Sequence, residues 1–220
     1  QTYKNIEHII IDGKSSDDTL KIINEFHHVS KIVSEKDLGI YYALNKGIKE
    51  ATGNIIGFLH ADDFLSSNNT IELISDYFLK NKDLDAVYGD LEYILELENK
   101  KIRFWKSETF EESKLKKGWM PPHPTLYTKA ELYTKYGHFN TNYLISADYD
   151  LILRFFKNEI KTKYIPKVLV KMRIGGASNK NIKNIIKKTK EDFLTIRKNK
   201  IGGLFTLLNK NISKISQFWK

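Results

Sequence analysis

The segment Asn54-Ile-Ile-Gly-Phe-Leu-His-Ala-Asp-Asp63 constrains the fold more than any other part of the chain. Its apolar run predicts a strand at Ile55–Leu59 that is buried inside a sheet. The run leads directly into two adjacent carboxylates, Asp62 and Asp63. A buried carboxylate is costly unless a cation or hydrogen-bond donors meet it, so both acids are expected at the rim of the sheet. Ligands of open α/β sheets bind at this rim, and oxygen ligands there suit Mg²⁺ or Mn²⁺ with a phosphate-bearing substrate.

Strands and helices alternate through the first half of the chain. Strands are predicted at Asn5–Asp12, Lys31–Ser34, Ile55–Leu59 and Ala86–Tyr88, and helices at Asp17–Phe26, along the apolar stripe from Ile40 to Ala51, and at Asn69–Lys80. This order predicts an α/β fold with a mostly parallel, doubly wound sheet that is flanked by helices.

The second half changes character and predicts a smaller antiparallel portion. A hairpin is predicted from Leu91–Leu97 and Ile102–Lys106, which flank Asn99-Lys100. Further elements are predicted as a strand at Thr125–Thr128, helices at Glu131–Tyr136 and Asp148–Asn158, a strand at Tyr164–Ile174 that ends at Gly175-Gly176, and two helices near Ile182–Lys198 and Leu204–Phe218.

The net charge of +9 is concentrated at the C-terminal end of the chain. Residues 180–220 hold eleven Lys or Arg side chains and only two acids, Glu191 and Asp192, so the remainder is balanced. We therefore expect a catalytic domain at residues 1–178 and a basic amphipathic helical tail at 179–220. Such a tail is typical of contact with an anionic membrane surface, and the alternative is a helical face packed on the body of the protein. Nucleic-acid binding is not expected, because no module for it is recognisable.

Composition narrows the chemistry and the location. The chain has no cysteine, which excludes disulfides, thiolate zinc sites and cysteine nucleophiles. No apolar run approaches the roughly 20 residues that cross a bilayer. The expected location is the cytoplasm. The basic tail adds a second expectation, which is peripheral attachment to the inner face of the cell membrane.

Four segments in this order closely resemble the family 2 glycosyltransferases with the GT-A fold. They are Ile9-Ile-Ile-Asp-Gly-Lys-Ser-Ser-Asp-Asp-Thr19, Ser34-Glu-Lys-Asp-Leu-Gly-Ile-Tyr-Tyr-Ala-Leu-Asn-Lys-Gly-Ile48, Gly53–Asp63 and Ser146-Ala-Asp-Tyr-Asp-Leu-Ile-Leu-Arg154. The resemblance covers the chain from Gln1 to about Ser178. Gln1-Thr2-Tyr3 looks like the end of the family's first helix, so a preceding strand and helix of about 30 residues are expected in the whole protein. In the family, that strand carries part of the nucleotide-base pocket.

The resemblance implies a set of donor-binding residues. Asp12 matches a contact to the base of the nucleotide, although Asp-Gly is also a turn signal. Asp37 matches a donor-site residue, and it is equally suited to cap the helix that follows. Asn45 is a candidate for the ribose or the diphosphate, with a solvated helix position as its alternative. His60 replaces the first acid of the family's Asp-x-Asp motif, which usually touches the ribose.

The same motif implies the metal site. Asp62 matches the last acid of Asp-x-Asp and is the expected ligand of Mn²⁺ or Mg²⁺. Asp63 is a second candidate ligand, or it caps the following loop. The cation would neutralise the charge of the departing nucleoside diphosphate.

Asp148 matches the family's catalytic base, which accepts the proton of the acceptor hydroxyl so that the sugar is transferred with inversion. The alternative is a structural cap of the helix that begins here. Asp150 stands four residues before Arg154, as in an ordinary surface ion pair. His123 and Trp119 are candidates for contact with the acceptor or the diphosphate. Their alternatives are a structural loop histidine and a hydrophobic plug.

The resemblance implies an inverting glycosyltransferase. Its donor would be a nucleoside-diphosphate sugar, with UDP as the expected nucleotide, and its acceptor a hydroxyl of a glycan or a lipid-linked saccharide. Assembly of bacterial surface polysaccharide or O-antigen is the expected setting. Two alternatives remain open at this point: a nucleotidyltransferase that makes sugar nucleotides on a similar sheet, and a non-enzymatic basic module that binds membranes or nucleic acid.

Overall fold

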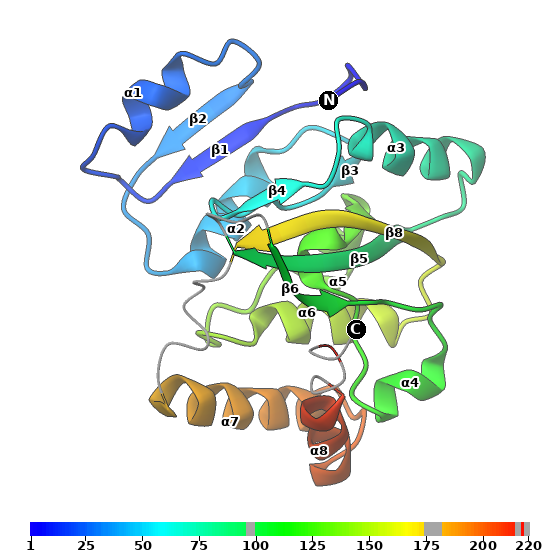
Figure 1. Ribbon diagram of the computed structural model, residues 1–220. Coiled ribbons are helices and arrows are strands. Elements are labelled where there is room, and N and C mark those ends of the chain that lie inside the picture. Colours follow the sequence, from blue (N-terminus) through cyan, green and yellow to red (C-terminus); the bar gives the residue numbers. More distant parts are fainter. Residues whose placement is uncertain (96–99, 174–181, 214–216, 218–220) are drawn as a thin grey trace.

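The chain forms an α/β fold with two sheets and several layers of helices (Figure 1). The computed structural model describes residues 1–95, 100–173, 182–213 and 217. The predicted α/β class is confirmed. Asn99 of the predicted hairpin turn, Gly175-Gly176 and the tail residues Lys180, Lys214, Ile215, Phe218, Trp219 and Lys220 lie outside the described residues.

A two-stranded parallel sheet is made by the first strand–helix–strand unit. Strands β1 (Ile9–Asp12) and β2 (Lys31–Ser34) pair with Ile10 opposite Ile32, and α1 (Thr19–Asn24) connects them. The helix is shorter than the predicted Asp17–Phe26 and buries none of its residues, and Phe26 lies beyond its end and is exposed. Helix α2 (Ile40–Glu50) follows β2 and packs against β1 (Figure 1).

The larger sheet has six strands and is mainly antiparallel. Its order is β3 (Ile55–Ile56), β7 (Tyr127–Lys129), β5 (Ala86–Leu95), β8 (Thr162–Arg173) and β4 (Asp63–Leu65), and β6 (Lys100–Trp105) also pairs with β5. Within this sheet, β5 and β8 form the parallel pair, and the other pairs are antiparallel. The strand–helix alternation of the first half did not indicate this, because β3 and β4 are strands of two and three residues that pair antiparallel with β7 and β8 of the second half.

The route from β3 to β4 differs from the strand that the sequence predicts. Strand β3 ends at Ile56, and Leu59 is exposed rather than buried. A Cβ atom at Gly57 would lie 2.1 Å from the ring of Tyr127, so the glycine allows the chain to pass this ring as it leaves the sheet. Asp63 is therefore the first residue of β4 rather than the last of a buried strand.

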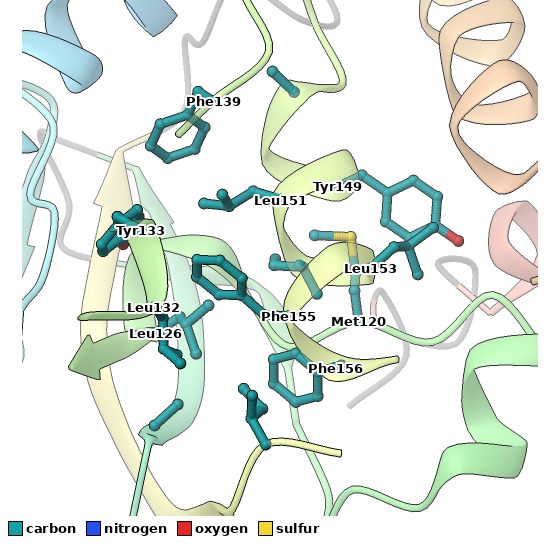
Figure 2. Packing of buried hydrophobic residues seen from close by; sticks show 14 of the residues in the cluster. Met120, Leu126, Leu132, Tyr133, Phe139, Tyr149, Leu151, Leu153, Phe155 and Phe156 are labelled. Carbon is teal, nitrogen blue, oxygen red and sulfur yellow. The ribbon is translucent and has the colours of Figure 1, made fainter. Parts of the chain in front are cut away.

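Helices lie on both sides of the larger sheet as it is drawn in Figure 1. Helix α3 (Thr70–Lys80) lies above it, and below it lie α4 (Glu112–Lys116), α6 (Ala147–Phe156), α7 (Ile182–Lys198) and α8 (Leu204–Ile212). Two further short helices are η1 (His123–Thr125) and α5 (Glu131–Tyr136). Helix α6 confirms the predicted helix and is almost wholly buried. Leu151, Phe155 and Phe156 project from it into the main core (Figure 2).

The C-terminal helices belong to this core. Ile196 of α7 and Leu207 of α8 are buried in the same hydrophobic cluster as α6. The two tail helices that the sequence predicts are confirmed in their described parts, and they pack on the body of the protein. None of the helices in the described residues combines the length and apolar character that crossing a bilayer requires.

Candidate active site

Three of the predicted acids line one large cleft. The cleft has a volume of about 2700 Å³, and its wall includes Asp62 and Asp63 at the start of β4, Asp148 at the start of α6, and both His60 and His123. The acids come from parts of the chain that are far apart in sequence. The charges of both Asp62 and Asp148 act on His60, so the fold places a proposed metal ligand and the proposed base around this ring.

Asp63 is a buried carboxylate without a sufficient set of partners. Its side chain is 9% exposed, and its Oδ2 atom has no hydrogen-bond partner in the part of the chain that the structure describes. Burial, followed by the charge of the adjacent Asp62, raises the pKa of Asp63 from 3.8 to about 7. A cation beside both carboxylates would remove this penalty.

The two acids fit a divalent cation that is shared with a substrate. Among the described residues, no group of three or more His, Cys, Asp or Glu side chains could hold a metal ion. Mg²⁺ does not need such a group, because it commonly takes one or two carboxylates and completes its shell with water and substrate phosphates. Asp62 and Asp63 are suited to such a site.

His60 and His123 form a neutral pair of rings in the cleft. Their centroids are 6.0 Å apart. Burial lowers the pKa of His123 to about 4, against the opposing attraction of Asp148. Burial also lowers the pKa of His60, and the charges of Asp148 and Asp62 act on it in the opposite direction. At neutral pH these rings are therefore hydrogen-bonding groups rather than cations.

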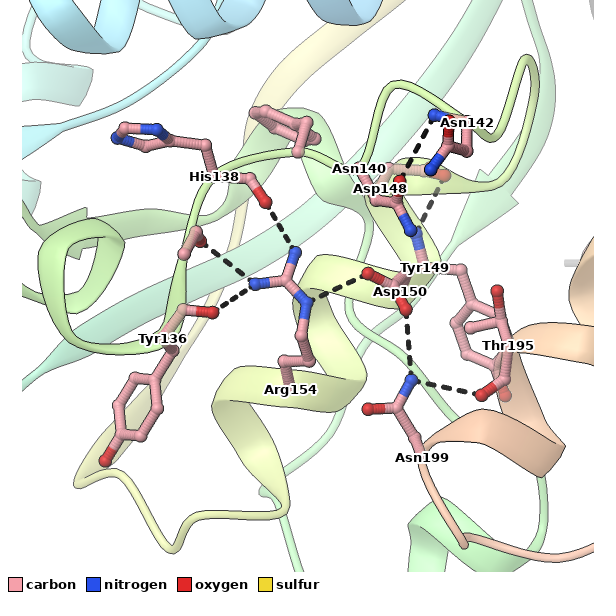
Figure 3. A network of polar contacts seen from close by, with 12 residues as sticks. Tyr136, His138, Asn140, Asn142, Asp148, Tyr149, Asp150, Arg154, Thr195 and Asn199 are labelled. Carbon is pink, nitrogen blue, oxygen red and sulfur yellow. Dashed lines mark hydrogen bonds and ion pairs between the residues drawn. The ribbon is translucent and has the colours of Figure 1, made fainter.

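Asp148 lies in the first turn of α6, and Ser146 is the N-cap residue of this helix. The Oδ1 atom of Asp148 accepts a hydrogen bond from the backbone N–H of Tyr149 at 2.8 Å (Figure 3). The hydroxyl of Tyr41, from α2, lies 3.3 Å from the same atom and 2.5 Å from the carbonyl oxygen of Ile145. Asp148 is thus oriented by contacts from two helices, and its place inside the helix differs from the capping position that was its alternative.

Asp150 has a structural role that the sequence did not reveal. Its expected i,i+4 pair with Arg154 forms, but Asp150 is 1% exposed, so the pair is buried rather than at the surface. Its Oδ2 accepts from Nε of Arg154 at 2.9 Å, and its Oδ1 accepts from Nδ2 of Asn199 at 3.1 Å (Figure 3). Arg154 also donates to the carbonyl oxygens of Tyr136, Gly137 and His138. This network ties α6 to α7 and to the loop after α5.

Asp12 and Asp37 lie together at the ends of β1 and β2, but they are not part of the cleft wall. Asp12 accepts hydrogen bonds from the backbone N–H groups of Lys14 and Ser15 and from the hydroxyls of Ser15 and Ser34. This is the turn that Asp-Gly also indicated.

The Asp37 loop is held to the Asp12 loop. A Cβ atom at Gly13 would be 3.8 Å from Oδ2 of Asp37. Lys46 forms ion pairs with Asp37 and, at 2.8 Å, with Glu35. These contacts shape the region next to the cleft where the resemblance expects the nucleotide.

Asn45 and Trp119 do not line the cleft. The side chain of Asn45, which is partly buried, donates to the carbonyl oxygen of Phe139 and accepts from its N–H, both at 2.9 Å, so both ends of its amide are taken by the backbone. Trp119 packs edge-on against Tyr88 and Phe156, with ring centroids 5.7 and 5.8 Å apart. It is the hydrophobic plug that was the alternative to a sugar platform.

Sequence reasoning missed three residues of the cleft region. Tyr41 was hidden within an amphipathic helix, and Arg173 ends β8, where it lines the cleft over the ring of Phe64. Glu191 was counted only as one of two acids in the basic tail, but it contacts the loop before α6. No local pattern marks these residues, because their partners are distant in sequence.

An α/β fold with paired carboxylates and a further acid around one cleft fits a glycosyltransferase of the GT-A type. The family described as "Glycosyl transferase family 2" matches residues 1–143, and the chain belongs to this family.

Relatives agree with this assignment. A PGL/p-HBAD biosynthesis glycosyltransferase of Mycobacterium bovis is 30% identical over 185 residues, which cover 81% of this chain and 70% of the relative. The chondroitin synthase of Pasteurella multocida is 28% identical over 200 residues, 89% of this chain but 20% of that protein.

Solved structures show the same fold. S. aureus TarS in complex with UDP-GlcNAc has a TM-score of 0.69 at 14% identity, with 97% of this chain and 66% of that chain covered. The mannosyltransferase PcManGT from Pyrobaculum calidifontis in complex with GDP-Man and Mn²⁺ has a TM-score of 0.58 at 18% identity, with 87% and 54% covered. The chain thus spans about two thirds of the TarS structure.

Proposed function

We propose that this glycosyltransferase moves a sugar, with inversion, from a UDP-linked donor to a hydroxyl of a glycan or lipid-linked saccharide. The observation that carries the proposal is the common cleft of Asp62, Asp63 and Asp148. The neighbouring structures with UDP-GlcNAc and GDP-Man support a nucleoside-diphosphate sugar as donor. The mycobacterial and Pasteurella relatives support an acceptor in glycolipid or polysaccharide synthesis, and bacterial O-antigen is one such product.

Transfer of the sugar requires that the acceptor hydroxyl loses its proton and that the nucleoside diphosphate leaves. The acceptor oxygen attacks the anomeric carbon from the face opposite the diphosphate, and the carbon–oxygen bond to the diphosphate breaks with its electron pair. Asp148 takes the hydroxyl proton, because a hydroxyl is a poor nucleophile without a general base. His60 and His123 are neutral in this cleft and serve as hydrogen-bond partners of the sugar or the diphosphate.

Asp62 and Asp63 would hold Mn²⁺ or Mg²⁺. A divalent cation there would supply charge neutralisation for the departing nucleoside diphosphate. The Mn²⁺ in the mannosyltransferase complex supports this choice. Asp12, at the end of β1, and Asp37, in the loop after β2, would bind the nucleotide part of the donor.

The C-terminal helices support a contact with anionic membranes. Helix α8 exposes Leu204, Phe205, Leu208 and Ile212 on its outer surface, and α7 carries exposed lysines beside exposed isoleucines. A basic helix with exposed apolar residues is typical of an interfacial helix. We therefore propose a peripheral place at the inner face of the cell membrane, where a lipid-linked acceptor would be found.

The donor is tested by incubating the full-length protein with UDP-, GDP- and dTDP-sugars and measuring hydrolysis by mass spectrometry, with and without Mn²⁺. We expect release of UDP that depends on the cation. Hydrolysis of none of the three classes, in the presence of Mn²⁺ or Mg²⁺, would contradict the proposed function.

Membrane contact is tested by co-sedimentation of the full-length protein with phosphatidylglycerol-containing vesicles and with neutral vesicles. We expect binding to the anionic vesicles alone, and its loss when Phe205 and Leu208 are both replaced by Glu. Equal binding by the double variant and the parent would remove α8 from this role.

A further inference from the structure

Glu191 lies on α7 and holds the loop that leads to Asp148. Its Oε1 accepts a hydrogen bond from the backbone N–H of Leu144 at 3.1 Å. Its Oε2 accepts from the N–H groups of Ile145 at 2.8 Å and Ser146 at 3.0 Å. The side chain is buried. One carboxylate thus satisfies three consecutive backbone donors that are more than 40 residues away in sequence.

The residues held in this way are those that orient the proposed base. Ile145 presents its carbonyl oxygen to the hydroxyl of Tyr41, and Ser146 is the N-cap of α6, two residues before Asp148. All three residues of the loop line the cleft. A shift of this loop would therefore move the first turn of α6, and Asp148 with it, relative to the acids of β4.

A second contact fixes the part of α7 that carries Glu191. The adjacent Asp192 forms a buried ion pair with Lys210 of α8, at 2.6 Å between Oδ2 and Nζ. The same Nζ atom lies 4.0 Å from the centroid of the Tyr149 ring, in the first turn of α6. Helices α7 and α8 thus hold both the loop and the helix on which Asp148 stands.

We propose that Glu191 is a positioning residue for sugar transfer, and that the basic C-terminal helices are for this reason a part of the active site. The proposal rests on the proposed function only in giving Asp148 the role of base. A carboxylate is suited to the task, because hydrogen bonds from N–H groups to a charged acceptor are about twice as strong as those to a neutral one. The three donors also precede the N-terminus of α6, where negative charge is favourable.

The test compares Glu191→Gln, Glu191→Ala and Glu191→Asp with Lys190→Ala, an exposed neighbour on the same helix. The first measurement is amide hydrogen exchange of residues 144–146 in the full-length protein without substrate. Loss of one charge-assisted bond corresponds to about a tenfold change in an opening equilibrium. We expect exchange at least about tenfold faster in Glu191→Gln and Glu191→Ala, and parental exchange in Lys190→Ala.

The second measurement is steady-state kinetics with a UDP-sugar. We expect a tenfold or larger fall of kcat in Glu191→Gln with the donor KM unchanged, since the acids of β4 are not altered. Glu191→Asp keeps the charge and should recover a part of kcat. If Glu191→Gln only lowered the fraction of folded protein, kcat per folded molecule would equal that of the parent.

Two results would overturn the proposal. Unchanged exchange of residues 144–146 in Glu191→Ala would show that the carboxylate does not hold the loop. Faster exchange with parental kcat in Glu191→Gln would show that the loop does not position the base. Because exchange is measured without substrate, the first result is independent of the reaction, and an active Asp148→Asn enzyme would reveal failure of the proposed base separately.

Discussion

The hydroxyl of Tyr41 lies 3.3 Å from Oδ1 of Asp148, although 107 positions separate the two residues in the sequence. Burial, followed by the charge of Asp148, raises the pKa of Tyr41 far above its ordinary value. Tyr41 therefore keeps its proton throughout the accessible pH range and remains a donor. It joins α2, which follows β2, to α6, the helix that carries the proposed base.

Replacing Tyr41 with Phe should impair catalysis more than folding. The change removes the hydroxyl whose single proton is shared between the carbonyl oxygen of Ile145 and Oδ1 of Asp148, but it retains the buried ring. A hydrogen bond to a charged group is worth about 1.5–3 kcal/mol, so kcat should fall by about 10- to 100-fold. Tyr42→Phe, at the next and more exposed position, is the matched control. Equal kcat values in the two variants would contradict the role of Tyr41.

Replacing Asp148 with Asn should abolish turnover and spare donor binding. The amide cannot accept the hydroxyl proton, and removal of a general base lowers rates by about 10²–10⁴-fold. Mn²⁺-dependent binding of UDP, measured by calorimetry, should remain, because Asp62 and Asp63 are unaltered. Asp62→Ala should show the converse, with weakened UDP binding in Mn²⁺. If Asp148→Asn retained parental turnover, another group would have to be the base.

The pKa of Asp63 predicts how stability depends on pH without a cation. Its pKa is raised from 3.8 to about 7 in the folded chain. Between these values only the folded state holds the proton, so the free energy of unfolding should decrease as the pH rises through this window. Asp63→Asn should lose this component of the slope, which denaturation at a series of pH values would measure.

Mn²⁺ should reverse this dependence of the free energy of unfolding on pH. The cation binds the ionised carboxylate, so its stabilising effect should be larger at pH 8 than at pH 5.5. Thermal denaturation of the parent and of Asp63→Asn at both pH values would check this. A stabilisation by Mn²⁺ that is equal at the two pH values, or equal in the two proteins, would exclude Asp63 as a ligand.

The sequence predicted the elements whose signals are local. The stripe from Ile40 to Ala51 and the apolar pattern that follows Asp148 became α2 and α6 with shifts of one or two residues. Asp62, Asp63 and Asp148 were found because the family's motifs keep them in a fixed order, and the fold places all three at one cleft.

Contacts that depend on tertiary packing could not be predicted. Asn45 has the polar character of a solvated helix residue, but a backbone segment 94 positions away takes both atoms of its amide. Strand β3 stops at Ile56 because Gly57 passes the ring of Tyr127, which no local pattern indicates. The buried Glu191 was similarly concealed by a basic stretch that resembles a solvated tail.

Two ion pairs with the same sequence spacing should differ greatly in their effect on stability. Asp76 and Lys80 form an i,i+4 pair at 3.2 Å with half-exposed or more exposed side chains, whereas Asp150 and Arg154 form one at 2.9 Å with Asp150 buried. Asp76→Ala should change the free energy of unfolding by less than about 1 kcal/mol, as exposed pairs do. Asp150→Ala leaves the Arg154 guanidinium and one N–H of the Asn199 amide without their carboxylate partner, so the free energy of unfolding should fall by about 3–5 kcal/mol. Urea denaturation of both variants measures the difference, and similar losses would mean that the network around Asp150 does not hold α6 to α7.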